Sequence, residues 1–133
     1  MDLRKKTELI VIHCAATKAS MDIGASEIKR WHVDDNGWDD IGYHYIVKRD
    51  GIVEVGRPEA FQGAHAPAVN SKSIGICLVG GMADDGGAEN NFTLQQFLAL
   101  KDLIKRLIMT NSNIKEVIGH CDIQANKKDC PGF

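Results

Sequence analysis

A short run of apolar, mostly β-branched residues between Glu8 and Ala15 is the feature that most constrains the fold. Its centre, Ile10–Ile12, offers no polar side chain to solvent, which is the pattern of a strand buried on both faces. Such a strand needs a sheet that is covered on both sides. The length of 133 residues suits one layered domain, and we expect a single domain over residues 1–133.

Two segments have the sequence pattern of amphipathic helices. In the first, Ser26 is expected to cap the helix, and Asn36-Gly37 supplies a left-handed stop. In the second, Thr93 and Gln96 match a capping box ahead of a long apolar stripe. Each stripe must be buried against another element, and a sheet face can bury it.

Four further segments have the composition of strands. Tyr43–Lys48 and Ile52–Val55 flank Asp50-Gly51, a dipeptide that favours a tight hairpin, and Ser73–Val79 and Glu116–His120 follow. The order is therefore strand, helix, three strands, helix, strand. We predict an α/β fold in which one domain has a central mixed β-sheet flanked by α-helices.

Charge and hydropathy exclude several classes of partner. Lys and Arg number 16 and Asp and Glu 18, a net charge of −2, so no nucleic-acid partner is expected. The apolar run near the N-terminus breaks at His13, too short for a signal peptide or for membrane insertion. We expect a monomer that is made in the cytosol without a signal peptide.

Four cysteines occur without any C-x-x-C pair, and we expect free thiols. Cys14 and Cys121 directly follow His13 and His120, and successive side chains of a strand point to opposite faces. If the histidines face a site, these two cysteines should face away from it. Together with Cys77, they are interpreted as small buried apolar residues.

His13 and His120 close the first and last predicted strands, and Cys130 lies ten residues beyond His120. Imidazole and thiolate are ligands that Zn²⁺ prefers, and three of them leave a fourth position open for water. Spacing alone leaves other interpretations: ordinary structural histidines, a type 1 copper site, or a cysteine hydrolase with Cys130 as nucleophile and a histidine as base.

Several blocks of sequence match a known family in the right order, from about His13 to Phe133. The chain resembles the zinc-dependent N-acetylmuramoyl-L-alanine amidases of the bacteriophage-lysozyme type, which share a fold with animal peptidoglycan recognition proteins. The blocks that carry the resemblance are Ile12–Lys18, Gly42–Gly51, Gly63–Ala66, Asn70 with Ser73–Gly81, and Lys128–Phe133.

The resemblance implies that His13, His120 and Cys130 hold Zn²⁺ and that Tyr43 and Lys128 assist catalysis. An ion with these ligands lowers the pKa of a bound water toward about 7. Lys128 would stabilise the oxyanion of the tetrahedral intermediate, and the phenol of Tyr43 would donate a hydrogen bond.

The resemblance also implies a cleft over the metal that binds peptidoglycan or a muropeptide. His65 and Asn70 are candidates for contacts with this substrate, whereas His44 is expected to be structural. The expected reaction is hydrolysis of the amide between N-acetylmuramoyl residues and L-alanine, by a phage or prophage endolysin that reaches the cell wall on lysis. The alternative is a non-catalytic recognition module, but such relatives usually lack the thiolate ligand.

Overall fold

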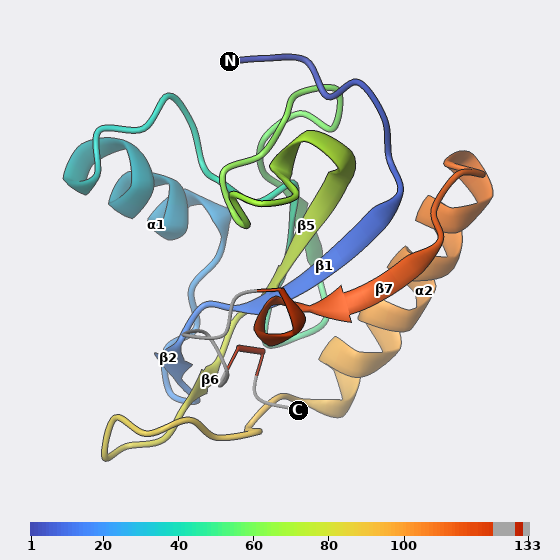
Figure 1. Ribbon diagram of the computed structural model, residues 1–133. Coiled ribbons are helices and arrows are strands. Elements are labelled where there is room, and N and C mark those ends of the chain that lie inside the picture. The colour runs from blue at the N-terminus through green and yellow to red at the C-terminus, as the bar shows by residue number, and fades with distance from the viewer. Residues whose placement is uncertain (124–129, 132–133) are drawn as a thin grey trace.

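The computed structural model describes residues 1–123 and 130–131. Its central sheet has the strand order β4-β3-β5-β1-β7, and only β4 runs antiparallel to its neighbour (Figure 1). The sheet is therefore mixed, as predicted. Its strands are β1 (Leu9–Cys14), β3 (Tyr45–Val47), β4 (Val53–Val55), β5 (Ser73–Leu78) and β7 (Glu116–Gly119).

The two main helices pack on opposite faces of this sheet. Helix α2 (Leu94–Thr110) covers the face that carries Ile74, Ile76 and Leu78, whereas α1 (Ala25–Arg30) packs near Cys77. The two faces arise because successive residues of β5 point in opposite directions. The prediction of a central sheet flanked by helices is confirmed.

Helix α2 begins as its sequence predicts. The backbone N–H of Gln96 donates to Oγ1 of Thr93 at 3.1 Å, and the N–H of Thr93 donates to Oε1 of Gln96 at 2.9 Å. Gln96 is fully buried and also donates to the carbonyl oxygens of Val47 and Val79. The capping box thus fixes the helix to two strands as well as to its own first turn.

The first helix begins differently from the prediction, which was wrong in naming Ser26 as its cap. Gly24 is the N-cap, and its N–H donates to the carboxylate of Glu27 at 3.0 Å. Glu54, on β4, accepts from the N–H of Ala25 at 2.8 Å. A carboxylate on β4 therefore adds to the local bond that Glu27 makes at the start of the helix. The helix then continues as a π-helical turn over Trp31–Asp35 and stops, as expected, before Gly37, whose φ is +73°.

Two short strands were not predicted. β2 (Thr17–Lys18) pairs in parallel with β6 (Gly81–Met82) and forms a separate two-stranded sheet. Two-residue strands are shorter than any hydrophobic pattern can register. This small sheet extends the molecule beyond the carboxyl ends of β1 and β5 (Figure 1).

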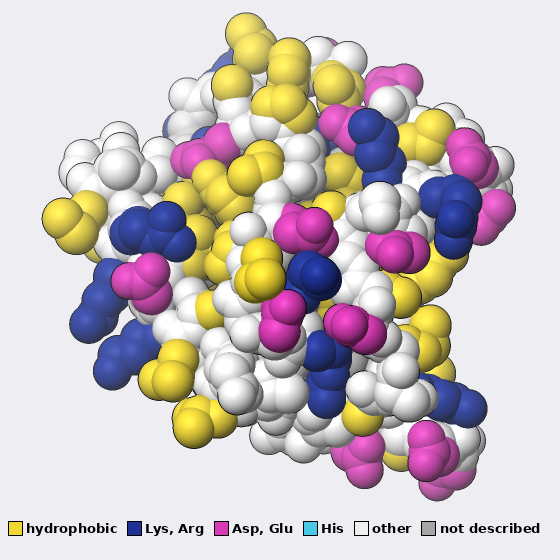
Figure 2. All heavy atoms as spheres, turned by 180° about the vertical axis from the view of Figure 1, so that it is seen from behind, with side chains coloured by type: hydrophobic (Ala, Val, Ile, Leu, Met, Phe, Trp, Pro, Cys, Tyr) yellow, Lys and Arg dark blue, Asp and Glu magenta, His cyan; other side chains and the backbone are white. Residues whose placement is uncertain are grey.

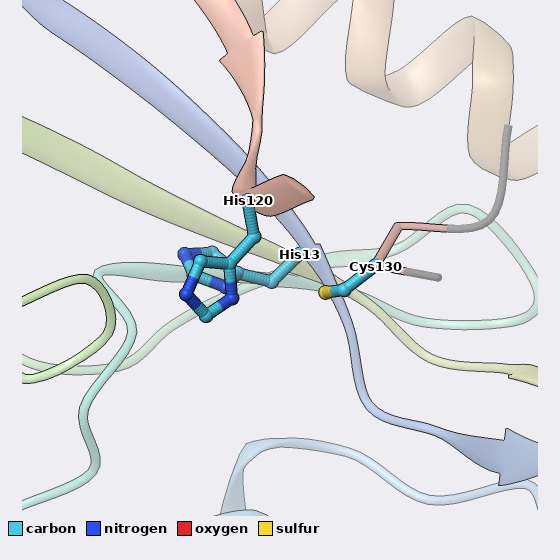
Figure 3. A group of neighbouring side chains, drawn as sticks. All are labelled: His13, His120 and Cys130. Atoms are coloured by element: carbon cyan, nitrogen blue, oxygen red, sulfur yellow. The ribbon is translucent and has the colours of Figure 1, made fainter. Parts of the chain in front are cut away.

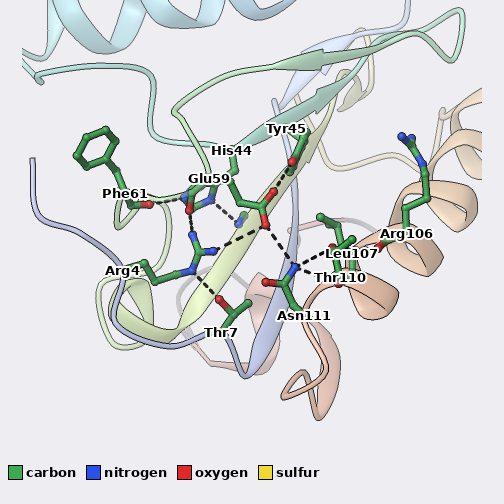
Figure 4. Close-up of polar contacts among 11 residues, drawn as sticks. Arg4, Thr7, His44, Tyr45, Glu59, Phe61, Arg106, Leu107, Thr110 and Asn111 are labelled. Carbon is green, nitrogen blue, oxygen red and sulfur yellow. Dashed lines mark hydrogen bonds and ion pairs between the residues drawn. The ribbon is translucent and has the colours of Figure 1, made fainter.

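A polar cluster joins the N-terminal segment to the end of α2 (Figure 4). Glu59 is at its centre: its carboxylate accepts from the hydroxyl of Tyr45 at 2.5 Å and from the amide of Asn111 at 3.3 Å. Arg4 forms an ion pair with the same carboxylate. Burial and the bond to Glu59 raise the pKa of Tyr45 to about 12, so its phenol remains a donor. This cluster therefore stabilises the packing of three distant segments.

The side turned away from the viewer of Figure 1 has a mixed surface. Acidic and basic side chains lie interspersed on it, and no histidine is visible there (Figure 2). Within residues 1–123 and 130–131, no helix has both the length and the apolar character needed to cross a bilayer.

Candidate metal centre

His13, His120 and Cys130 come together at one edge of the sheet (Figure 3). Their candidate ligand atoms all lie within 4.8 Å of one another. β1 and β7 are parallel neighbours, so His13 near the end of β1 and His120 just after β7 meet at the same edge. The fold thus brings together three side chains that are far apart in sequence.

The three residues fit a zinc ion in both spacing and chemistry. Tetrahedral zinc, with bonds of about 2.0–2.3 Å, needs donor atoms roughly 3.5 Å apart, so one ion can reach all three atoms after a small movement. Two imidazole nitrogens and one sulfur suit zinc and leave a fourth position open. His13 is only 1 % exposed and His120 only 7 %, so the surrounding protein holds both rings.

The ionisation of the site also suits a cation. Burial, followed by the nearby His65 and His120, lowers the pKa of His13 well below its usual value, so its ring is neutral as a metal ligand must be. The contact with the Cys14 thiol and then burial raise the pKa of Cys130. Its thiolate form therefore requires a positive charge beside it, which a bound metal ion supplies.

Cys14 does not lie where the sequence predicts. Its sulfur is 3.9 Å from the sulfur of Cys130, and its backbone N–H donates to that sulfur at 3.3 Å. The expectation that Cys14 faces away from the site was wrong, because Cys14 is the last residue of β1 and Cys130 lies against this end of the strand. Cys77, in contrast, is fully buried as predicted, and no disulfide joins the four cysteines, which all lie among the described residues.

His65 contacts the buried side of His13. Its Nδ1 atom lies 2.8 Å from Nε2 of His13, and the two rings meet edge to face. Gly75 makes this position possible, since a Cβ there would lie 2.6 Å from the His65 ring. His65 is 7 % exposed and also lines the cleft, so it reaches both the candidate ligand and the space where a substrate would bind.

A further histidine near His65, His44, is structural as expected. Its Nε2 atom bonds to the carbonyl oxygen of Phe61 at 2.8 Å, and its Nδ1 atom accepts from the N–H of Gly75 at 3.0 Å. Burial is the main reason why its pKa falls to about 4. Both ring nitrogens therefore form hydrogen bonds to backbone groups, and these bonds anchor β5 to the segment before β3.

Asn70 stands apart from the cluster. The side-chain oxygen of Asn70 accepts from the backbone N–H groups of His65 and Ala66, at 3.1 and 2.8 Å. It closes the loop that carries His65 and is not among the described residues that line the cleft. Lys128 lies outside the described residues.

Tyr43 lies beside the candidate ligands, just before β3 rather than at the start of a strand as predicted. Its ring centre is 5.1 Å from that of His13, and it lines the cleft. Burial, followed by the neighbouring cysteines, raises its pKa well above the usual value. The phenol therefore stays protonated and can act as a hydrogen-bond donor.

A cleft of about 460 Å³ opens over the cluster. One wall, which the sequence did not predict, comes from β6 and the glycine-containing loop after it, because a polar loop has no signal that places it near a site. Trp38 also lines the cleft, and its ring centre lies 4.5 Å from that of His32. The described lining residues are His13, Cys14, Ala15, Ala16, His32, Trp38, Tyr43, Ala64, His65, Gly81, Met82, Gly86, Gly87, Ala88, His120 and Cys130.

Comparison of the sequence with known proteins gives matches over nearly its whole length. Residues 3–133 match the N-acetylmuramoyl-L-alanine amidase family. The endolysin of Klebsiella phage KP32 is 44 % identical over 130 residues, which cover 98 % of this chain and 83 % of the phage protein. The endolysin of Escherichia phage T7 is 42 % identical over 130 residues, which again cover 98 % of this chain and 83 % of the phage protein.

Solved structures give the same result for the fold. An endolysin N-acetylmuramoyl-L-alanine amidase from Clostridium intestinale superposes with a TM-score of 0.83 at 30 % identity, covering 99 % of this chain and 79 % of the other. The Drosophila protein PGRP-LB superposes with a TM-score of 0.81 at 26 % identity, covering 99 % and 78 %.

Proposed function

The chain belongs to the N-acetylmuramoyl-L-alanine amidase family, and from that premise we propose that it hydrolyses the amide between N-acetylmuramoyl residues and L-alanine of peptidoglycan, with Zn²⁺ as its cofactor. It acts as a phage or prophage endolysin, as a monomer that reaches the cell wall when the cell lyses. The observation that carries the proposal is the convergence of His13, His120 and Cys130 beneath an open cleft.

The ligand residues are suited to hold the ion firmly. His13 and His120 would bind it as neutral imidazoles and Cys130 as a thiolate, and the burial of both rings limits their movement. When bound, Zn²⁺ supplies a Lewis acid that makes water a nucleophile at neutral pH. The cleft above the three side chains gives the substrate carbonyl access to that position.

Tyr43 and Lys128 act on the substrate in this proposal. The protonated phenol of Tyr43 lies beside His13, where it can donate a hydrogen bond to the carbonyl oxygen as negative charge develops on it. Lys128 supplies a positive charge to the same oxyanion. His65 lines the cleft and contacts the substrate, whereas Asn70 contributes by closing the loop that carries His65.

Mass spectrometry of peptidoglycan digests tests the proposal. We expect new L-alanine amino termini and peptide-free N-acetylmuramic acid. Neither product should form with chelator-treated protein, and both should form again when Zn²⁺ is added. Product formation that survives chelation would instead favour Cys130 as a nucleophile. Binding to peptidoglycan without any new amino terminus would indicate a recognition module. A protein that is colourless as purified in air, before any metal is added, would exclude a type 1 copper site.

A further inference from the structure

We propose that His65 and Ser73 are positioning residues that determine which nitrogen of His13 is available to the metal. The inference rests on the proposed zinc amidase function, in which His13 is a ligand. It concerns a chain of side-chain contacts that runs from His13 away from the cleft and into the protein.

This row of contacts has four members, which are the side chains of His13, His65 and Ser73 and the backbone carbonyl of Val69. Nε2 of His13 lies 2.8 Å from Nδ1 of His65, and Nε2 of His65 lies 3.3 Å from Oγ of Ser73. The hydroxyl of Ser73 donates to the carbonyl oxygen of Val69 at 2.8 Å. Each ring nitrogen in this row has one partner, and the row ends on a backbone group.

The last member determines the direction of every bond. A carbonyl oxygen can only accept, so the single hydroxyl hydrogen of Ser73 points to Val69. Toward His65, Ser73 can therefore only accept, and the proton of a neutral His65 ring is on Nε2. Nδ1 of His65 is left as an acceptor, so His13 donates through Nε2–H.

The consequence for the site follows from the chemistry of imidazole. A neutral ring has one N–H and one lone pair, so His13 keeps the lone pair on Nδ1, the nitrogen not used by His65. Reversing the row would place the proton on Nδ1 of His13 and block metal binding there. It would also leave two oxygens 2.8 Å apart without a hydrogen between them at Ser73 and Val69.

Ser73 and His65 are held in place by their surroundings, which keeps the direction of these hydrogen bonds fixed. Ser73 is fully buried, and it is the first residue of β5. His65 is fixed on one side by Gly75 and along its backbone by the side chain of Asn70. This arrangement resembles the general pattern in which an outer partner orients a metal-bound histidine, here with an imidazole in place of the more common carboxylate or carbonyl group.

The direct test is the tautomeric state of the wild-type protein, measured by long-range ¹H–¹⁵N NMR with ¹⁵N-labelled histidine. In zinc-loaded and chelator-treated samples, we expect His65 to be protonated on Nε2. In the chelated sample, we also expect His13 to be protonated on Nε2, with its lone pair on Nδ1. A proton on Nδ1 of either ring in the chelated protein would overturn the inference.

Zinc affinity of variants gives a second test, by competition with a chromophoric chelator. Ser73→Ala and His65→Leu should each weaken binding by about 10–100-fold, the usual loss for an outer partner of a ligand. His65→Asn, which keeps an acceptor near the place of Nδ1, should bind zinc more tightly than His65→Leu. Unchanged affinity in Ser73→Ala, or equal affinities of the two His65 variants, would contradict the proposal.

Two controls separate this inference from other causes. Thr93→Ala removes the cap of α2. The Thr93 side chain bonds to Arg49 and Gln96 and is not among the described residues that line the cleft, so the variant should lower stability without changing zinc affinity or the His13 tautomer. Neither readout depends on turnover. A protein that fails to cleave peptidoglycan but shows the expected tautomers would therefore contradict the proposed function and still support the role of His65 and Ser73.

Discussion

The two faces of β5 differ sharply in what they carry. Toward α2, the strand presents Ile74, Ile76 and Leu78, all fully buried in an apolar cluster. On the other face, Ser73 contacts His65, and Gly75 leaves room for the His65 ring. One strand therefore contributes to the apolar core under α2 with one face and supports the candidate metal site with the other.

The difference shows how a small protein can bury a polar site at tolerable cost. Apolar burial under α2 stabilises the fold in proportion to the area removed from water. A buried imidazole or hydroxyl costs free energy unless it is hydrogen-bonded. Among the described residues that are not exposed, no buried side-chain nitrogen or oxygen lacks a partner. The site face, which carries Ser73 and Gly75, thus hydrogen-bonds each of its buried polar groups and also packs the apolar cluster around Cys77, whereas the α2 face depends mainly on packing.

The largest expected effect is the loss of activity when Cys130, the candidate sulfur ligand, is replaced. Cys130→Ser replaces a soft thiolate by a hydroxyl, a poor ligand for zinc, and we expect amide cleavage to fall below detection. The circular dichroism spectrum should stay the same, because the core under α2 is untouched. Cys121→Ser makes the same exchange at a cysteine outside the ligand group and should remain active. Unchanged turnover in Cys130→Ser would refute the ligand set.

Tyr43→Phe tests the same face without touching the ligands. It removes only the phenolic hydroxyl, and the loss of a donor to a developing oxyanion typically lowers kcat about 100–1,000-fold. Zinc affinity should stay at the wild-type value, since Tyr43 is not a ligand. Steady-state kinetics on a soluble muropeptide, together with zinc competition, measures both quantities. A loss of zinc affinity equal to the loss of activity would assign Tyr43 to the metal site instead.

On the opposite face, the expected effect is on stability. Leu103, on α2, is 3 % exposed within the apolar cluster, and Leu103→Ala should lower the free energy of unfolding by about 2–5 kcal/mol. Leu98→Ala is the matched control, because Leu98 is 59 % exposed and its loss should change little. Urea denaturation measures both. Zinc affinity of the folded Leu103→Ala protein should be unchanged, and a large fall would show that the two faces are coupled.

The α2 face could be predicted from the sequence because its determinants are local. The capping box of Thr93 and Gln96 lies within one turn, and Ser73–Val79 predicts β5 to within one residue of its observed end. The convergence of both histidine ligands at one sheet edge also followed from their places at strand ends. Periodicity and capping together therefore define the layered fold.

The site face held what the sequence could not indicate. His65 contacts His13 across 52 residues, and no local pattern records which ring nitrogen faces which. The sulfur of Cys14, at the end of β1, lies 3.9 Å from that of Cys130, a contact across 116 residues that no local pattern records. The carboxylate of Glu54 caps α1 from a strand 29 residues further along the chain. These features depend on tertiary contacts and need coordinates.

The smallest of these expected effects is a dependence of stability on pH that comes from the site face alone. The pKa of His44 is lowered to about 4 in the folded protein, against about 6.5 when unfolded. The unfolded chain therefore takes up a proton first as the pH falls. His44 thus favours folding above pH 6.5, and this advantage is lost between pH 6.5 and 4, by up to roughly 3 kcal/mol. Urea denaturation of chelated protein across this range gives the slope of the unfolding free energy against pH, which reports the number of protons taken up on unfolding. His44→Asn should reduce that number by about one, whereas Leu103→Ala should lower the free energy at every pH without changing the slope. An unaltered slope in His44→Asn would mean that His44 accepts a proton in the folded state, and that this part of the site face is open to water.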